Sequence, residues 1–251
     1  MNQFGLGAFA SLISGTATAI GAIPIFFTKE LNERYTDTLL GFSAGVMLAS
    51  SSFSLLIPAL NIANYDPFKV FMVCAGVLCG GMCLGLIDKV VPHFHTIMGY
   101  EGRSSRLNKV ILFVIAITIH NFPEGLAVGV SFSAGNFKDG LAIAIGIGLQ
   151  NIPEGTAVAF PLISEGVSKR KAFFITLFTG LVEAVGGLIG ALLVKLSTSI
   201  LPFMLSFAAG AMLFVICDEI IPETHRGENY RISTYGIIIG FIVMMVFDTM
   251  L

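Results

Sequence analysis

Long apolar runs alternate with short polar connections along this chain of 251 residues. Crossing about 30 Å of hydrocarbon takes about 20 residues of α-helix. Apolar runs of about this length or longer cover residues 4–28, 37–60, 68–92, 108–134, 138–164, 170–194, 201–222 and 233–250. The stretches are continuous and contain interspersed Gly and Ala, whereas strands of a membrane barrel alternate over about ten residues. The pattern therefore predicts an all-α integral membrane protein with eight transmembrane helices.

Composition supports a multi-pass membrane protein. Hydrophobic residues make up 55% of the chain and charged residues 12%, and the mean hydropathy is +0.87. These values lie outside the range of soluble globular domains, so we expect residues 1–251 to form a single transmembrane domain. The first run has no basic segment before it and no early cleavage pattern, which favours a membrane helix over a signal peptide. The cysteines show no Cys-x-x-Cys spacing and are interpreted as small apolar residues: Cys74, Cys79, Cys83 and Cys217.

The basic residues are unevenly distributed between the two sets of loops. Of the 14 Lys and Arg residues, 11 lie in or beside the loops that follow the first, third, fifth and seventh helices. Because basic loops stay on the cytoplasmic side, this set is predicted to face the cytoplasm and both termini to face outward, in the plasma or inner membrane of a cell. The loop at residues 93–107, between the third and fourth helices, is then cytoplasmic.

Two related motifs lie 30 residues apart inside apolar runs. They read His-Asn-Phe-Pro-Glu-Gly at residues 120–125 and Gln-Asn-Ile-Pro-Glu-Gly at residues 150–155. The first and fifth positions of each motif are at i and i+4, so both side chains project from one helix face. With a rise of about 1.5 Å per residue, both motifs lie near the middle of the membrane. Pro123 and Pro153 leave backbone carbonyls unpaired, which is tolerated in membranes where a carbonyl lines a cavity or binds an ion.

Charge then indicates what such a site binds. Glu124, Glu154 and Glu183 fall in three consecutive apolar runs, and no Lys or Arg is expected at their depth. Either protons or a bound cation must offset three buried carboxylates. Together with the His120 imidazole and amide oxygens, carboxylates suit Zn²⁺, Fe²⁺, Mn²⁺ or Cd²⁺ better than Na⁺ or K⁺. Asn121 and Asn151 can equally serve as hydrogen-bonding contacts between helices.

At these residues the chain resembles the Zrt/Irt-like (ZIP) family of divalent metal transporters. The resemblance covers essentially the whole chain, including a cytoplasmic loop that carries histidines, here His93 and His95. It implies that the metal is held by His120, Glu124 and Glu154, with an adjoining second position completed by Asn121, Gln150, Asn151 and Glu183. It also points to Met47 as a thioether ligand, for which a core methionine is an equal alternative. The chain departs from many relatives at Gln150, where they have histidine, and at Asn151, where they have an acidic residue.

A second, shorter repeat relates the second and seventh helices. Residues 44–48, Ala-Gly-Val-Met-Leu, resemble residues 209–213, Ala-Gly-Ala-Met-Leu, and each segment is followed by an Ile-Pro pair. In the expected topology these helices run in opposite directions, which predicts that helices 1–3 and 6–8 are inverted repeats around helices 4 and 5. Asp218 and Glu219, still inside the seventh apolar run, are the best of the inner carboxylates to receive metal on exit.

The sequence thus predicts a transporter that moves divalent transition metals, zinc foremost and also iron, manganese or cadmium, into the cytoplasm by alternating access. It predicts no enzymatic activity, no cofactor beyond the transported metal and no nucleic-acid partner. The expected partners are the metal ions, the lipid bilayer and, by the resemblance, a second copy in a homodimer. Two alternatives stay open. An intramembrane metal-dependent hydrolase would use the same ligands, although there is no His-Glu-x-x-His motif, and a selective cation channel would show flux that does not saturate.

Overall fold

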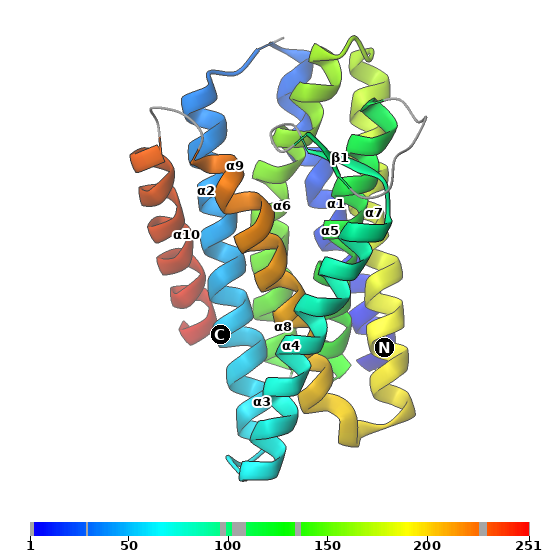
Figure 1. The fold of residues 1–251 in the computed structure, drawn as a ribbon, viewed down its shortest axis with the longest axis vertical. Helices are drawn as coiled ribbons and strands as arrows, with labels where there is room; N and C mark the ends of the chain where they lie inside the picture. Colours follow the sequence, from blue (N-terminus) through cyan, green and yellow to red (C-terminus); the bar gives the residue numbers. More distant parts are fainter. Residues whose placement is uncertain are drawn as a thin grey trace.

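The computed structural model describes residues 3–28, 30–95, 99–101, 109–133, 137–225 and 230–250. Over these residues the chain forms eight helical segments of membrane length, arranged side by side (Figure 1). The all-α membrane fold predicted from the sequence is confirmed. Seven of the described segments are both long and apolar enough to cross a membrane. The eighth, α6 (Phe137–Ser164), has 28 residues but carries the polar side chains of the second motif.

The observed bounds follow the apolar runs closely. The long helices are α1 (Gln3–Ala22), α2 (Glu33–Ala49), α4 (Pro67–Val90), α5 (Lys109–Ser133), α6, α7 (Lys169–Leu196), α8 (Leu201–Val215) and α10 (Tyr230–Met250). Short α3 (Ile57–Ile62) and α9 (Ile221–Thr224) extend α2 and α8, and single 3₁₀ turns lie at Ile23–Phe26 and Thr198–Ile200. Strands β1 (His93–His95) and β2 (Gly99–Glu101) form a small antiparallel ribbon with Phe94 opposite Tyr100. The ribbon lies in the predicted 93–107 loop, whose other residues, 96–98 and 102–107, lie outside the described ranges.

Local sequence explains where two of these helices begin. The Asn32 side chain accepts a hydrogen bond from the Arg34 amide, and the Asp66 side chain accepts from the amides of Phe68 and Lys69. Such side chains satisfy amides that have no partner within the first helical turn. Pro67 follows at the first position of α4, where its missing N–H costs nothing.

The second and seventh membrane segments share an unusual backbone. Each passes through a π-helix, η2 (Ser50–Leu56) or η4 (Ile216–Ile220), directly before an Ile-Pro pair. The Ile57 amide bonds the Ser52 carbonyl and the Ile221 amide bonds the Ile216 carbonyl, both five residues back. Proline clashes with the carbonyl four residues before it, so a local shift to this wider pattern accommodates the ring. The same deviation at matching places, in helices that run in opposite directions (Figure 1), agrees with the predicted repeat.

The helices pack in two groups. The site bundle consists of α1, α5, α6 and α7, and the flanking bundle of α2, α4, α8 and α10 with their short extensions. In the flanking bundle α2 packs on α10 and α4 on α8; between the bundles α2 packs on α6 and α5 on α8. β1 lies against α5. The ends of α4 and α6 and the starts of α2, α5, α7 and α10 share one end of the molecule (Figure 1). We call it the basic end, since Arg34, Lys89, Lys169 and Arg231 lie in these helix ends.

Candidate metal-binding site

Both motifs lie midway along helices that meet at the boundary between the bundles. α5 carries the first motif and α6 the second, and both helices continue through Pro123 and Pro153. Gly125 is required at its position because a Cβ there would lie 2.0 Å from the Glu183 carbonyl oxygen. The glycine that follows the first glutamate thus allows α5 to approach the α7 backbone, which fixes the height of the site.

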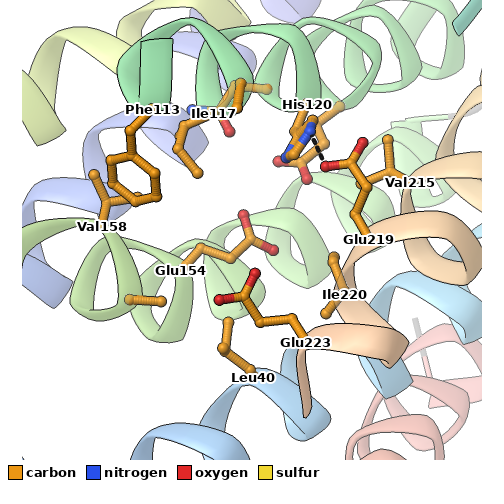
Figure 2. A pocket seen from close by; sticks show the side chains of 14 residues that line it. Leu40, Phe113, Ile117, His120, Glu154, Val158, Val215, Glu219, Ile220 and Glu223 are labelled. Atoms are coloured by element: carbon orange, nitrogen blue, oxygen red, sulfur yellow. Dashed lines mark ion pairs between the residues drawn. The ribbon is translucent and has the colours of Figure 1, made fainter. Parts of the chain in front are cut away.

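A cavity of about 60 Å³ lies between the bundles next to the motifs (Figure 2). Its polar lining comes from His120, Asn121 and Glu124 of α5, Glu154 of α6, and Glu219 and Glu223 of the flanking bundle. The other residues that line it are apolar: Leu40, Phe113, Ala116, Ile117, Ala157, Val158, Val215 and Ile220. Among the lining residues that the structure describes there is no Lys or Arg. Its carboxylates therefore favour a positively charged occupant.

Four of the polar groups of the cavity have a partner within the protein: His120, Glu219, Glu154 and one oxygen of Glu124. His120 Nε2 forms an ion pair with Glu219. Ser43 Oγ donates to Glu154 Oε1 at 2.5 Å, and Gln150 Nε2 donates to Glu124 Oε1 at 2.8 Å. Consistent with this pairing, no three His, Cys, Asp or Glu side chains of the described residues surround a common point. Metal binding at this cavity therefore requires these side chains to exchange protein partners for the ion.

One carboxylate oxygen is already available for a cation. Glu124 Oε2 is buried and has no hydrogen-bond partner among the described atoms, although its other oxygen accepts from Gln150. The side-chain oxygen of Gln150 is also buried without a hydrogen-bond partner among the described atoms. Buried acceptors without donors are costly unless something occupies their lone pairs. A divalent cation bound in the cavity beside Glu124 would satisfy its Oε2.

Glu183 belongs to a second cluster, behind the cavity. Its carboxylate is fully buried on α7 and accepts from Ser14 Oγ at 2.9 Å and from Asn151 Nδ2 at 2.6 Å. Asn151 Nδ2 also donates to the Ser14 carbonyl at 2.8 Å, which joins α1, α6 and α7. These three residues do not line the cavity. The predicted site residues thus fall into a cavity group (His120, Asn121, Glu124, Glu154), the connecting Gln150, and a buried pair (Asn151, Glu183).

Met47 lies elsewhere in the packing. It is fully buried in the apolar core with Ala44, Leu55 and Met212, and it does not line the cavity. Its role as a metal ligand stays a prediction.

Two residues of the flanking bundle complete the surroundings of the site. Glu219 was singled out by its position in an apolar run, and the structure pairs it with His120. Ser43 was missed by sequence reasoning, because a single serine in an apolar run has no spacing that distinguishes it from a packing residue. Only its contact with Glu154 reveals it.

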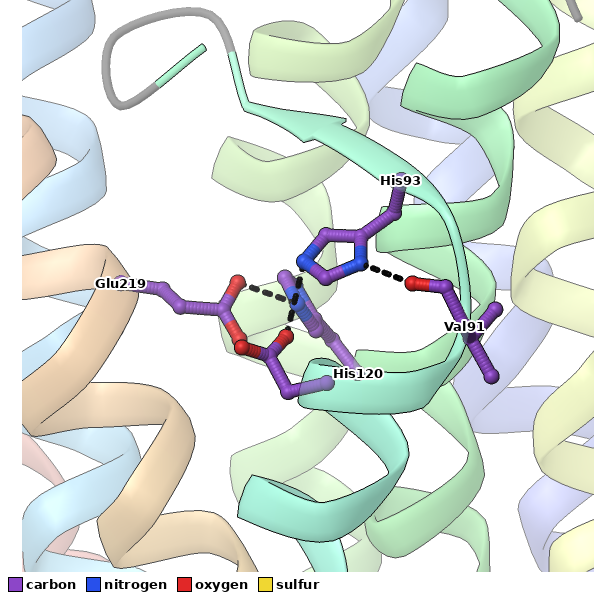
Figure 3. Close-up of polar contacts among 5 residues, drawn as sticks. Val91, His93, His120 and Glu219 are labelled. Carbon is purple, nitrogen blue, oxygen red and sulfur yellow. Dashed lines mark hydrogen bonds and ion pairs between the residues drawn. The ribbon is translucent and has the colours of Figure 1, made fainter. Parts of the chain in front are cut away.

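His93 lies at the basic end, outside the membrane segments and close to His120 and Glu219 (Figure 3). Its Nε2 pairs with Asp88 at 2.8 Å and its Nδ1 contacts the Val91 carbonyl at 2.7 Å. Burial alone lowers the pKa of an imidazole, but the hydrogen bond to Asp88, with the Val91 carbonyl and the charge of Glu219, raises the pKa of His93 to about 9. This histidine is therefore a cation at neutral pH and anchors β1. The side chain of His95 lies outside the described residues.

A second cavity, of about 420 Å³, lies at the opposite end of the bundle. Asp139 and Asp248 line it, and Ser54 Oγ donates to Asp248 Oδ1 at 2.6 Å. Fully buried apolar residues of the helices between the two cavities pack in one continuous cluster, among them Met47, Ala127 and Ala209. The residues that line the first cavity lie instead between the motifs and the basic end. The site is thus approached from the basic end and closed toward the other.

Comparison with known proteins adds an independent line of support. Residues 99–248 match the family model described as ZIP Zinc transporter. Zinc transporter GufA of Myxococcus xanthus is 46% identical over 249 residues, which cover 97% of this chain and 98% of the relative. Zinc transporter ZIPB of Bordetella bronchiseptica is 39% identical over 94% of this chain and 78% of its own length. Human zinc transporter ZIP11 is 33% identical over 92% of this chain and 93% of its own.

Proposed function

Because the chain belongs to the ZIP family of zinc transporters, we propose that it carries zinc and related divalent transition-metal ions through the cavity lined by His120, Glu124 and Glu154. The relatives are named as transporters, so the hydrolase alternative is set aside. The transported ion is the substrate. The proposed cargo includes iron, manganese and cadmium beside zinc.

The observation that supports this site most directly is the convergence of an imidazole and two carboxylates from α5 and α6 on one cavity without a lining Lys or Arg. Zinc is bound in proteins by these donors. Gln150 and Asn121 can add amide oxygens, and Glu183 with Asn151 would supply an adjoining position if both side chains turn from α1 toward the cavity.

Transport requires the site to be exposed to each side in turn. By the positive-inside rule the basic end faces the cytoplasm, so the arrangement described here is the cytoplasm-facing one. We propose that the site bundle moves against the flanking bundle to open the opposite cavity. Inward movement of a divalent ion gains about twice the 2.3 kcal/mol that one charge gains per 100 mV of membrane potential.

The decisive experiment uses purified protein in liposomes. Uptake of Zn²⁺, Cd²⁺, Fe²⁺ and Mn²⁺ is measured for wild type, His120→Ala and Glu154→Ala, with Ser51→Ala as a matched control that leaves the cavity intact. We expect saturable uptake that is lost in the first two variants and retained in the control. Uptake that fails to saturate would favour a channel, and unchanged uptake in Glu154→Ala would remove the proposed site.

The resemblance further implies a homodimer in the plasma or inner membrane. The mass of the detergent-solubilised protein, determined by light scattering, tests the dimer directly. A monomer at micromolar concentration would contradict it.

A further inference from the structure

The Ser43 hydroxyl makes a contact between the two helix bundles at the site itself. Ser43 is fully buried on α2 of the flanking bundle, and its Oγ lies 2.5 Å from Oε1 of Glu154 on α6 of the site bundle. Its next acceptor, the Gln150 carbonyl, lies at 3.4 Å. A hydroxyl donor at this distance from a carboxylate makes a charge-assisted hydrogen bond.

Neighbouring serines show that this contact is not the default for the segment. The hydroxyls of Ser50, Ser51 and Ser52 donate to carbonyls of their own helix, four residues back. That local bond is the usual choice for a helical serine. Ser43 instead donates across the boundary to a side chain that lines the cavity.

The consequence is a competition for one oxygen atom. A metal ion that Glu154 binds through Oε1 competes with the Ser43 hydroxyl, because both draw on the electron density of the same buried oxygen. When the ion leaves, the hydroxyl again satisfies the carboxylate, which would otherwise remain buried without a donor at high cost. The bond therefore stabilises the metal-free, cytoplasm-facing arrangement. It does not stabilise a state in which Glu154 has moved away from α2.

We propose that Ser43 is a positioning residue that promotes metal release into the cytoplasm by taking over the Glu154 carboxylate. This inference rests on the proposed function, since it assumes that Glu154 binds the transported ion. It assigns to α2 a direct part in the release step, separate from the ligands on α5 and α6.

The test compares Ser43→Ala with Ser43→Thr, which keeps the hydroxyl, and with Ser51→Ala as the matched buried-serine control. Zinc binding to purified protein in detergent is measured by calorimetry, and transport in liposomes gives KM and kcat. We expect Ser43→Ala to bind zinc about tenfold more tightly, the scale set by one hydrogen bond to a charged group. KM and kcat should both fall, Ser43→Thr should restore them, and Ser51→Ala should match wild type.

Zinc affinity in Ser43→Ala that equals or falls below that of wild type would overturn the inference. Should Ser43→Ala not remain monodisperse, Ser43→Gly is measured with the same expectation. Measuring Glu154→Ala distinguishes a wrong role for Ser43 from a wrong proposed function. If that variant transports as wild type, the site is wrong; if it is inactive while Ser43→Ala binds as wild type, only the role of Ser43 is refuted.

Discussion

Each glutamate of the two motifs and of α7 lies in the membrane interior beside a neutral donor. Gln150 donates to Glu124, Ser43 to Glu154, and Ser14 with Asn151 to Glu183. Amide and hydroxyl donors satisfy a carboxylate without neutralising its charge. At the residue scale, the protein therefore keeps its acids in place while leaving a cation to supply the missing positive charge.

Asn151 should prove structural as well as functional. Asn151→Leu keeps the approximate volume but removes the donor to Glu183 and to the Ser14 carbonyl. Leaving these buried acceptors unsatisfied costs about 1–3 kcal/mol each. We expect a lower unfolding midpoint in detergent, measured by the circular dichroism of the helices. Asn61→Leu, at an exposed position, should stay close to wild type. An unchanged midpoint in Asn151→Leu would mean that Glu183 has found another donor.

His93 should titrate well above an ordinary histidine. Its pKa of about 9 exceeds the usual 6.5, so the stability from its pairing with Asp88 is fully present below pH 6.5 and is lost as the pH rises through about 9. Imidazole ¹⁵N chemical shifts of labelled protein measure this pKa directly. In Asp88→Asn the pKa should fall toward the usual value, since the carboxylate partner is removed; a value near 6.5 already in wild type would contradict the ion pair.

At the scale of elements, glycines determine how closely the helices of the site bundle approach. A Cβ at Gly125 would lie 2.0 Å from the Glu183 carbonyl oxygen, and one at Gly155 would lie 1.9 Å from the Thr18 carbonyl oxygen. Each motif therefore ends on the residue that places its helix against α7 or α1. The glutamate and the glycine of a motif act together, one as a cavity group and one as a packing contact.

Gly125→Ala tests this coupling. The added methyl group must separate α5 from α7, and overpacking of this kind costs about 1–3 kcal/mol. The matched control is Gly148→Ala in α6, where the nearest neighbour of a Cβ, the Ser14 Cα, is at 3.9 Å; it should be neutral or slightly stabilising because alanine favours helix. Thermal unfolding in detergent measures both variants, and equal midpoints would refute the close contact.

At the scale of the whole molecule, the two cavities and the core between them describe one state of a carrier. The cavity beside the motifs lies toward the basic end, and the cavity with Asp139 and Asp248 lies toward the other. Residues such as Met47 and Ala127 are fully buried between them. A continuous open path is therefore not the basis of transport in this arrangement, which favours alternating access.

Accessibility from the two sides of the membrane measures this state. In a background without the four native cysteines, Ala157→Cys lines the first cavity, whereas Ala127→Cys lies in the core. We expect a membrane-impermeant maleimide to label position 157 from the cytoplasmic side and to leave position 127 unlabelled. Labelling of position 157 from the outside alone would reverse the proposed orientation.

Much of the architecture was predictable because the bilayer restricts it. Apolar runs of about 20 residues must form helices to satisfy their backbone, so the observed bounds of α4 (Pro67–Val90) and α6 (Phe137–Ser164) differ by no more than two residues from the expected 68–92 and 138–164. The π-helices were not predicted. Their wider turns occur where a proline lies within a helix that neighbours hold on both sides. The Ile-Pro pairs alone do not specify a π-helix.

The sequence by itself determined the class of the protein, the eight spans and the membrane depth of His120, Glu124 and Glu154, because helical rise and hydropathy depend on local residues alone. Only the tertiary structure decided which of these side chains share a cavity, that Glu183 lies behind it with Ser14, and that Ser43 reaches Glu154. Such contacts join residues more than a hundred positions apart. They depend on how helices rotate and approach one another, which no local pattern in the chain encodes.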